Sequence, residues 1–295
     1  MRSDSREMDK DREDLRAPRG MSSLASVDGV KLHCEERGAG PAVLFVHEYG
    51  GSCRSFDMQV EAFRARYRCV AFNARGYPPS EVPASVGSYS QYHAAADIGA
   101  VLDGLAIERA HLVGVSMGAA SALQFALKQP GRVLSATLVG IGSGSDDPPL
   151  FRQTAEANAK QIESGGMRAF AEQMVRNPNR IRLMEKNPAE FRRSLEELSR
   201  MSPVGHAHTM RGVQARRPPL YAHEKRLASL RVRTLLVVGD EDAGCRKPSE
   251  FLGRVLPDAR LVVVPKTGHA VNQEEPAEFN RLCLAFIGAA TVAGA

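Results

Sequence analysis

The sequence predicts an α/β fold with a mostly parallel central sheet, helices on both faces, and a helical segment inserted between core strands. Short apolar runs alternate with helical patterns from about residue 22 to residue 142, and such alternation is typical of strand–helix–strand units with parallel strands. Strand patterns then stop, helical patterns take over, and the alternation resumes at Val232. We therefore expect a core formed by residues 22–145 and 227–295, with a helical cap, or lid, formed by residues 146–226.

The segment before this core has a different composition. Residues 1–20 are almost all charged or polar, with six basic and six acidic side chains. Such a segment cannot bury enough apolar surface to fold, so residues 1–21 are predicted to form a disordered tail. It lacks the apolar stretch that a signal peptide needs. Met21 fits an alternative start, because the folded pattern begins just after it.

Two early strands lead into polar loops. Apolar residues 42–46 precede a loop that begins at His47, and residues 69–72 precede a turn at 73–80. Short, continuous apolar runs of this kind are typical of buried strands. We interpret the turn at 73–80 as structural, a tight return from the sheet.

The next strand ends in a distinctive turn. A helical pattern at 92–102 and an apolar run at 110–113 precede Gly-Val-Ser-Met-Gly at 114–118, and a helix rich in small residues follows at 119–127. Gly-x-Ser-x-Gly between a strand and a helix is the nucleophile elbow. Its strained turn leaves no room for a Cβ on either side of Ser116, and the helix directs its first N–H groups toward the hydroxyl. A developing oxyanion could be held there.

One more predicted core strand and a loop lead into the predicted cap. Residues 133–139 form a further strand, and the glycine- and serine-rich residues 140–145 form a loop. Helical patterns follow over residues 151–163, 167–176 and 188–200.

The last two predicted strands supply an acid and a base. The apolar run at 233–238 leads to Asp240 and Asp242, and a second run at 260–264 leads to His269. The chain order is therefore serine, aspartate, histidine, which is the order of the nucleophile-elbow architecture. Spacing alone leaves both aspartates as candidates for the acid.

These features together resemble the α/β-hydrolase fold family. The matching segments are spread over residues 22–290 and include the elbow, the Gly-Asp-x-Asp strand end, and Gly268-His269 followed by Glu-Glu-Pro at 274–276. The resemblance implies that Ser116 is the nucleophile and His269 the general base. It places Asp242 at the position of the acid that orients the histidine, with Asp240 as the competitor.

The resemblance also places the oxyanion hole at the backbone N–H groups of Tyr49 and Met117. The family usually has a glycine after the histidine of this first loop, and this chain has Glu48 there. The His47-Glu48 pair is similar to that of dienelactone hydrolases, whose nucleophile is a cysteine. A carboxylate here would raise the pKa of His269; alternatively, it turns away to bind an arginine or the backbone.

The function expected from this resemblance is hydrolysis of small carboxylic esters or lactones through an acyl-enzyme. Within the family, the 3-oxoadipate enol-lactonase-like group is the most similar. A perhydrolase or cofactor-free haloperoxidase-type activity would use the same three residues, and a ligand receptor with a retained triad is an alternative of another class. Haloalkane dehalogenases and epoxide hydrolases carry aspartate at the elbow, so the serine disfavours them.

Composition excludes several other classes. The 295 residues are 43% hydrophobic and 25% charged, with no apolar run long enough to cross a membrane. Five scattered cysteines without a Cys-x-x-Cys motif fit free thiols in a reducing cytoplasm. No metal-ligand spacing or dinucleotide-binding glycine motif is present. We therefore expect no metal, no cofactor and no membrane as partner. We also expect no nucleic acid, because the net charge of +5 is too diffuse to indicate one.

The charge excess lies in the predicted cap. Residues 146–226 contain fifteen Lys or Arg and ten Asp or Glu, a difference of +5. A positive cap over a pocket can steer and orient a carboxylate, so the small-molecule substrate is expected to be anionic. The candidates are Arg211, Arg216 and Arg217, where the cap returns to the core. The alternative is a solvated, positively charged helical face.

Overall fold

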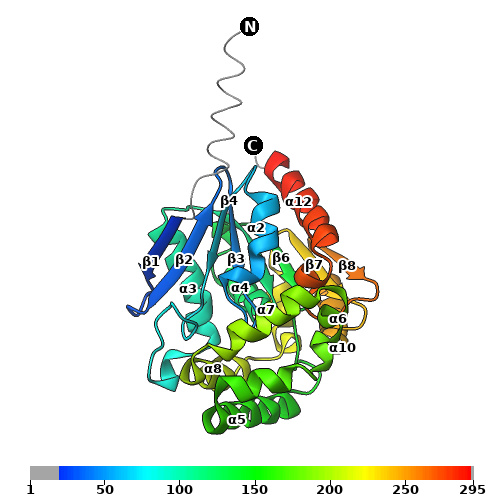
Figure 1. The fold of residues 1–295 in the computed structure, drawn as a ribbon. Helices are drawn as coiled ribbons and strands as arrows, with labels where there is room; N and C mark the ends of the chain where they lie inside the picture. Colours follow the sequence, from blue (N-terminus) through cyan, green and yellow to red (C-terminus); the bar gives the residue numbers. More distant parts are fainter. Residues whose placement is uncertain (1–19, 294–295) are drawn as a thin grey trace.

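The computed structural model describes residues 20–293, and within this range eight strands form one sheet (Figure 1). The predicted tail lies outside the described residues except for Gly20 and Met21, which begin the first strand. The strands are β1 (Gly20–Ala25), β2 (Lys31–Arg37), β3 (Ala42–Val46), β4 (Arg68–Phe72), β5 (Ala110–Val115), β6 (Val133–Val139), β7 (Thr234–Gly239) and β8 (Ala259–Val264).

The sheet is mostly parallel, as predicted. Its order is β1-β2-β4-β3-β5-β6-β7-β8, and the first two pairings are antiparallel whereas all the others are parallel. Val46 at the end of β3 pairs with Gly114, and Gly239 at the end of β7 pairs with Val264. The loops that follow these parallel strands therefore meet at one edge, where open α/β sheets bind their ligands.

Helices cover both faces of the sheet (Figure 1). Alternate residues of β3 face opposite layers, because successive side chains of a strand point to opposite faces. Leu44 packs with the helices at 91–104, 117–128 and 243–255, and Phe45 packs with those at 57–63 and 276–293. The helices outside the insertion are α2 (Asp57–Phe63), α3 (Gln91–Gly104), α4 (Met117–Lys128), α9 (Glu224–Ala228), α10 (Ala243–Val255), α11 (Val271–Glu274) and α12 (Pro276–Ala293). Short 3₁₀ helices are η1 (Cys53–Phe56), η2 (Val86–Ser88), η3 (Pro130–Arg132) and η5 (Leu220–His223), and η4 (Met210–Gln214) is a π-helix.

Five α-helices lie between β6 and β7, and the four that precede α9 lie together at one end of the sheet (Figure 1). They are α5 (Pro148–Met174), α6 (Pro178–Lys186), α7 (Pro188–Ser199) and α8 (Pro203–Thr209). Each begins with a proline after an Asp, Asn or Ser whose side chain caps the first turn, the pattern that starts a helix most effectively. The label α5 covers two helices that meet at Gly166, whose φ of 73° and ψ of 177° are not helical. This agrees with the separate helices predicted at 151–163 and 167–176.

Candidate active site

Ser116 stands in the strained turn between β5 and α4. Its backbone angles, φ of 53° and ψ of −110°, lie in a region that residues other than glycine rarely adopt. Its N–H donates to the carbonyl of Val139 at 2.8 Å. A Cβ on Gly118 would lie 1.9 Å from the carbonyl oxygen of Val46, and a Cβ on Gly114 would lie 2.6 Å from that of Gly118. Both glycines are therefore required for the serine to hold this position.

Asp242 and His269 meet at the ends of β7 and β8. Nδ1 of His269 lies 2.7 Å from Oδ2 of Asp242. The Asp242 residue is only 2% exposed, and although it precedes α10 its side chain does not cap that helix. The geometry is that of a carboxylate that fixes the tautomer and orientation of an imidazole.

Asp240, the alternative acid, has a different environment. It is exposed, and its Oδ1 accepts the N–H of Thr267 at 3.1 Å. Backbone hydrogen bonds from Lys266 and Thr267 lower its pKa. Asp240 therefore organises the loop before His269 and does not contact the imidazole through any hydrogen bond of the described residues.

The electrostatics of the Asp242–His269 pair favour a charged imidazole. Burial lowers the pKa of His269, but the charge and hydrogen bond of Asp242 raise it more, so that the pKa stays well above its usual range. Burial acts on Asp242 in the opposite direction, and His269 outweighs it and keeps the pKa of Asp242 below its usual value. The pair therefore stabilises the imidazolium that forms when His269 takes a proton.

A cavity of about 170 Å³, here called the inner cavity, is lined by both Ser116 and His269. The loop after β3 contributes Glu48, Tyr49 and Gly50, and the inserted helices contribute residues of α5, α6 and α7. The sequence-predicted serine and histidine thus face one cavity between the sheet edge and the insertion.

The two predicted oxyanion-hole residues lie beside this cavity. Tyr49 lines it, and Met117, the first residue of α4, is buried in a cluster against which Tyr49 packs. His47 holds the backbone of the Tyr49 loop: its Nδ1 lies 2.7 Å from the carbonyl of Glu48, and its Nε2 lies 3.0 Å from the N–H of Ala74. No role for His47 is predicted from the sequence. Its position directly after β3, at the start of the oxyanion-hole loop, is the signal that could have indicated this structural role.

Glu48 lines the inner cavity, and its Oε1 accepts hydrogen bonds from Ser55 (3.0 Å) and Gln273 (3.1 Å). Its charge acts on Arg180 of α6, whose pKa is lowered by burial and raised in part by Glu48. The side chains that contribute most to the shift in the pKa of His269 are Asp242 and Cys245. Glu48 is not among them, and its carboxylate is directed toward Ser55 and Gln273, so an effect of Glu48 on the histidine stays a prediction.

The three candidate arginines have different environments. Arg217 lines the inner cavity, donates to the carbonyl of Ser143 at 2.7 Å, and has its pKa lowered by burial to about 10. Arg211 instead pairs with Glu156 and Glu163. Its selection as an anion ligand was wrong for that reason.

Arg216 and Arg180 differ in their access to the inner cavity. Arg216 is exposed and does not line the inner cavity. Arg180, which the sequence did not single out, does line it; nothing in its helical surroundings distinguishes it from the other arginines of the insertion.

Cys245 adds a thiol next to the histidine. Its Sγ lies 3.1 Å from the carbonyl of Gly140 and 3.8 Å from Nδ1 of His269, so that Asp242, Cys245 and His269 bring three metal-capable donor atoms together. Burial raises the pKa of this thiol, which disfavours the thiolate that a metal requires. Its place one helical turn after Asp242 is a signal that sequence reasoning missed.

A second trio of such donors lies away from the cavity, at His33, Glu35 and Cys53. Arg54 lies 3.6 Å from the same carboxylate of Glu35, so a cation there would meet a positive charge. All five cysteines of the chain are buried and free, as predicted. The described helices include none that is long and apolar enough to cross a membrane.

The nucleophile elbow on a mostly parallel sheet, with a histidine–aspartate pair at the same edge, defines a hydrolase architecture. Residues 43–282 match the alpha/beta hydrolase family, and the chain belongs to that family.

Several relatives of known description are named as hydrolases. The chain is 28% identical over 267 residues to a putative carbamate hydrolase RutD of Azorhizobium caulinodans, covering 87% of this chain and 95% of that protein. It is 28% identical over 275 residues to a 2-hydroxy-6-oxo-6-phenylhexa-2,4-dienoate hydrolase of Burkholderia cepacia, with 87% and 91% covered. The crystal structure of the enol-lactonase from Burkholderia xenovorans superposes with a TM-score of 0.79 at 20% identity, with 92% of this chain and 100% of that chain covered. This last similarity shows the shared fold.

Proposed function

We propose that the protein is a serine hydrolase of small carboxylic esters or lactones, with Ser116 as nucleophile, His269 as general base and Asp242 as the acid that orients it. The observation that carries the proposal is the 2.7 Å contact between Asp242 and His269 at a cavity that Ser116 also lines. Nucleophile and base come from different strand ends, so their shared cavity is a tertiary arrangement and not a consequence of sequence spacing.

The reaction follows from these positions. Nε2 of His269 takes the hydroxyl proton as Ser116 attacks the carbonyl, and Asp242 stabilises the imidazolium. The N–H groups of Tyr49 and Met117 donate to the oxyanion of the tetrahedral intermediate. Collapse gives the acyl-enzyme and returns the proton to the leaving alcohol. Water then attacks the acyl-enzyme with His269 again as base.

The inner cavity limits the substrate. Its volume of about 170 Å³ suits a small acyl group, and the inserted helices act as a cap that excludes water from the reacting atoms. Within residues 20–293 no carboxylate forms an ion pair with Arg217, so this guanidinium is available to a substrate carboxylate. The relative from Burkholderia cepacia is named for a dienoate substrate, which supports including free acids in the substrate panel.

The test is covalent labelling followed by turnover. A fluorophosphonate probe should label the wild type and not Ser116→Ala, and a panel of esters and lactones should be hydrolysed by the wild type alone. Loss of this serine should reduce kcat by about 10⁶-fold. Labelling that persists in Ser116→Ala would assign the nucleophile to another residue, and a wild type inactive on the whole panel would reject the activity.

A further inference from the structure

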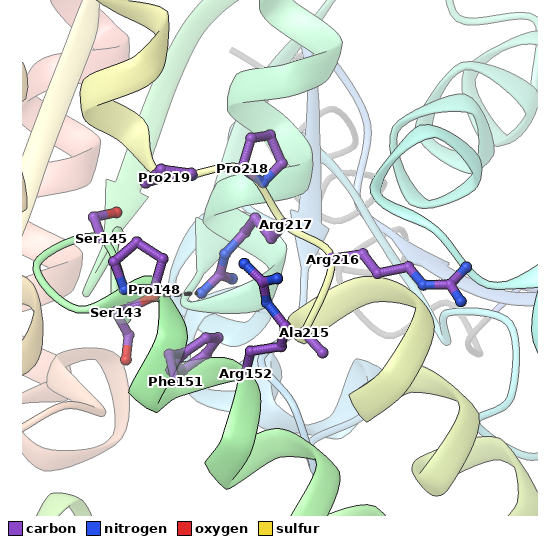
Figure 2. Close-up of a pocket in the computed structure, with 11 residues that line it drawn as sticks. Ser143, Ser145, Pro148, Phe151, Arg152, Ala215, Arg216, Arg217, Pro218 and Pro219 are labelled. Atoms are coloured by element: carbon purple, nitrogen blue, oxygen red, sulfur yellow. Dashed lines mark hydrogen bonds between the residues drawn. The ribbon is translucent and has the colours of Figure 1, made fainter.

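A second cavity lies against the inner cavity and is shown in Figure 2. This outer chamber has a volume of about 420 Å³ and is formed by the loop after β6, the start of α5 and the segment in which the insertion returns to the core. Ser143, Phe151 and Arg217 line both cavities. A substrate whose reacting carbonyl is at Ser116 can therefore extend past these three residues into the outer chamber.

The lining of the outer chamber is positively charged. Arg152, Arg216 and Arg217 line it, and none of its described lining residues is acidic. In Figure 2, Arg216 points away from the side chains of Arg152 and Arg217, and all three line the chamber. Positive charges that line one chamber without a carboxylate create a positive potential there, and this potential attracts an anion.

Carboxylates near the chamber are directed elsewhere: Glu156, four residues after Arg152 on α5, pairs with Arg211, and two more lie in the loop before α5. Asp147 caps α5 by accepting the N–H of Leu150, and Asp146 accepts the hydroxyl of Tyr221. Neither lines the outer chamber. Arg211, by contrast, is held by two glutamates, so ion pairing neutralises that arginine while Arg152 and Arg217 form no ion pair within the described residues.

Arg217 is prepared for a strong anion contact. Burial lowers its pKa to about 10, its guanidinium lies over the ring of Phe151 at 5.3 Å, and one of its nitrogens donates to Ser143. These contacts fix the plane of the fork while leaving other N–H groups free to donate. Guanidinium pairs suit oxyanions that accept several hydrogen bonds, and phosphate presents three acceptor oxygens with nearly two charges.

We propose that the outer chamber binds a phosphate monoester group carried at the distal end of the substrate, clamped by Arg152 and Arg217. This inference rests on the proposed function for the position of the reacting carbonyl. It specifies the substrate class as an ester or lactone with a small acyl part near Ser116 and a phosphorylated remainder in the outer chamber. The chemistry is unchanged hydrolysis at the carbonyl, and the phosphate group is only bound.

Binding is tested without turnover on Ser116→Ala, with inorganic phosphate as the probe. Thermal unfolding is measured in phosphate, acetate and chloride at equal pH and ionic strength. Phosphate should raise the unfolding midpoint in a saturable way, because a ligand that binds only the folded state stabilises it. Acetate, a monoanionic carboxylate that Arg217 can also contact, should raise it less than phosphate does, and chloride should not raise it. A phosphate effect no larger than that of acetate would overturn the proposal.

Arg152→Gln in the same background should weaken apparent phosphate affinity by roughly tenfold, as expected for loss of one charge-assisted contact. The matched control is Arg168→Gln, which removes an exposed arginine from the same helix α5 that lines neither cavity. Equal phosphate affinity in both variants would place the anion outside the chamber and overturn the proposal.

Kinetics separates the two proposals. The wild type is compared on a pair of esters that differ only in a distal phosphate, with kcat/KM expected to favour the phosphorylated member by about tenfold or more and to lose that preference in Arg152→Gln. Hydrolysis of both esters without preference would reject the outer chamber and leave the hydrolase intact. Arg152-dependent phosphate binding without any hydrolysis would reject the hydrolase and retain the anion site.

Discussion

Nδ1 of His269 lies 2.7 Å from Oδ2 of Asp242, which precedes it by 27 positions in the chain. The contact exists because β7 and β8 are adjacent parallel strands whose ends are in register, Gly239 opposite Val264. The loops that follow these strands therefore lie side by side. Burial of Asp242 leaves water little access to the pair, so the carboxylate acts on the imidazole through a low-dielectric contact.

Replacing Asp242 by asparagine should therefore reduce kcat by around 10⁴-fold, because the amide no longer stabilises the imidazolium and favours the wrong tautomer. Asp240→Asn should be mild, since the asparagine Oδ1 can still accept the N–H of Thr267. Steady-state kinetics on one ester measures both variants. The reverse ranking would transfer the orienting role to Asp240.

The spacing of residues in the sequence was sufficient to predict the nucleophile elbow. It was insufficient to decide which aspartate contacts His269. The elbow is local: Gly114, Ser116 and Gly118 occupy one turn, and their close contacts follow from that turn. Asp240 and Asp242 leave the same strand two positions apart, and only the path of the loop decides which carboxylate reaches His269.

For the inserted helices, the sequence predicts even less of the tertiary arrangement. Their proline and cap signals predict where helices begin, but the face that each presents to the cavity depends on how the helices pack. Arg211 meets Glu156 and Glu163 from a different helix, 55 and 48 positions away. Arg180 enters the inner cavity through the same kind of long-range packing.

The acidic limb of the kcat/KM profile should lie above the pH at which an ordinary histidine titrates, about 6.5. His269 must be neutral to accept the hydroxyl proton, so activity is lost as the pH falls through its pKa, and that pKa is raised. The measurement is kcat/KM of the wild type between acidic and alkaline pH on an ester without ionisable groups.

Glu48→Gln should leave this limb in place, because the carboxylate binds Ser55 and Gln273 and the charge of Asp242 dominates the upward shift in the pKa of His269. Asp242→Asn should move the limb to lower pH, since burial then acts on the imidazole without the opposing carboxylate. A downward shift of the limb in Glu48→Gln would instead restore an electrostatic role for Glu48 at the histidine.

The turn after β4 supports a stability prediction. Arg75 in this turn makes two hydrogen bonds, of 2.8 and 2.7 Å, to the buried carboxylate of Asp97 on α3. Asp97→Ala should lower the free energy of unfolding by about 3–5 kcal/mol, because it leaves a buried guanidinium with less compensation. Denaturant unfolding at neutral pH measures the change.

The control for this prediction lies on the same helix. Asp103 pairs with Arg132 in an ion pair where the aspartate side chain is 67% exposed, so Asp103→Ala should cost no more than about 1 kcal/mol. Similar losses in the two variants would mean that the turn at 73–80 does not depend on its buried ion pair.

Arg217 should give the enzyme a preference for anionic substrates. A free-acid ester should have a higher kcat/KM than its methyl ester, because the guanidinium in the inner cavity can bind the carboxylate bidentately. The preference should shrink as salt screens the attraction, and Arg217→Gln should remove it with a loss of about tenfold or more on the free acid.

Arg211→Gln is the matched control, since Glu156 and Glu163 already neutralise that arginine; it should retain the preference. A wild type that favours the neutral methyl ester at low salt would refute the role of Arg217, and an equal loss in both variants would assign the effect to the overall charge of the inserted helices.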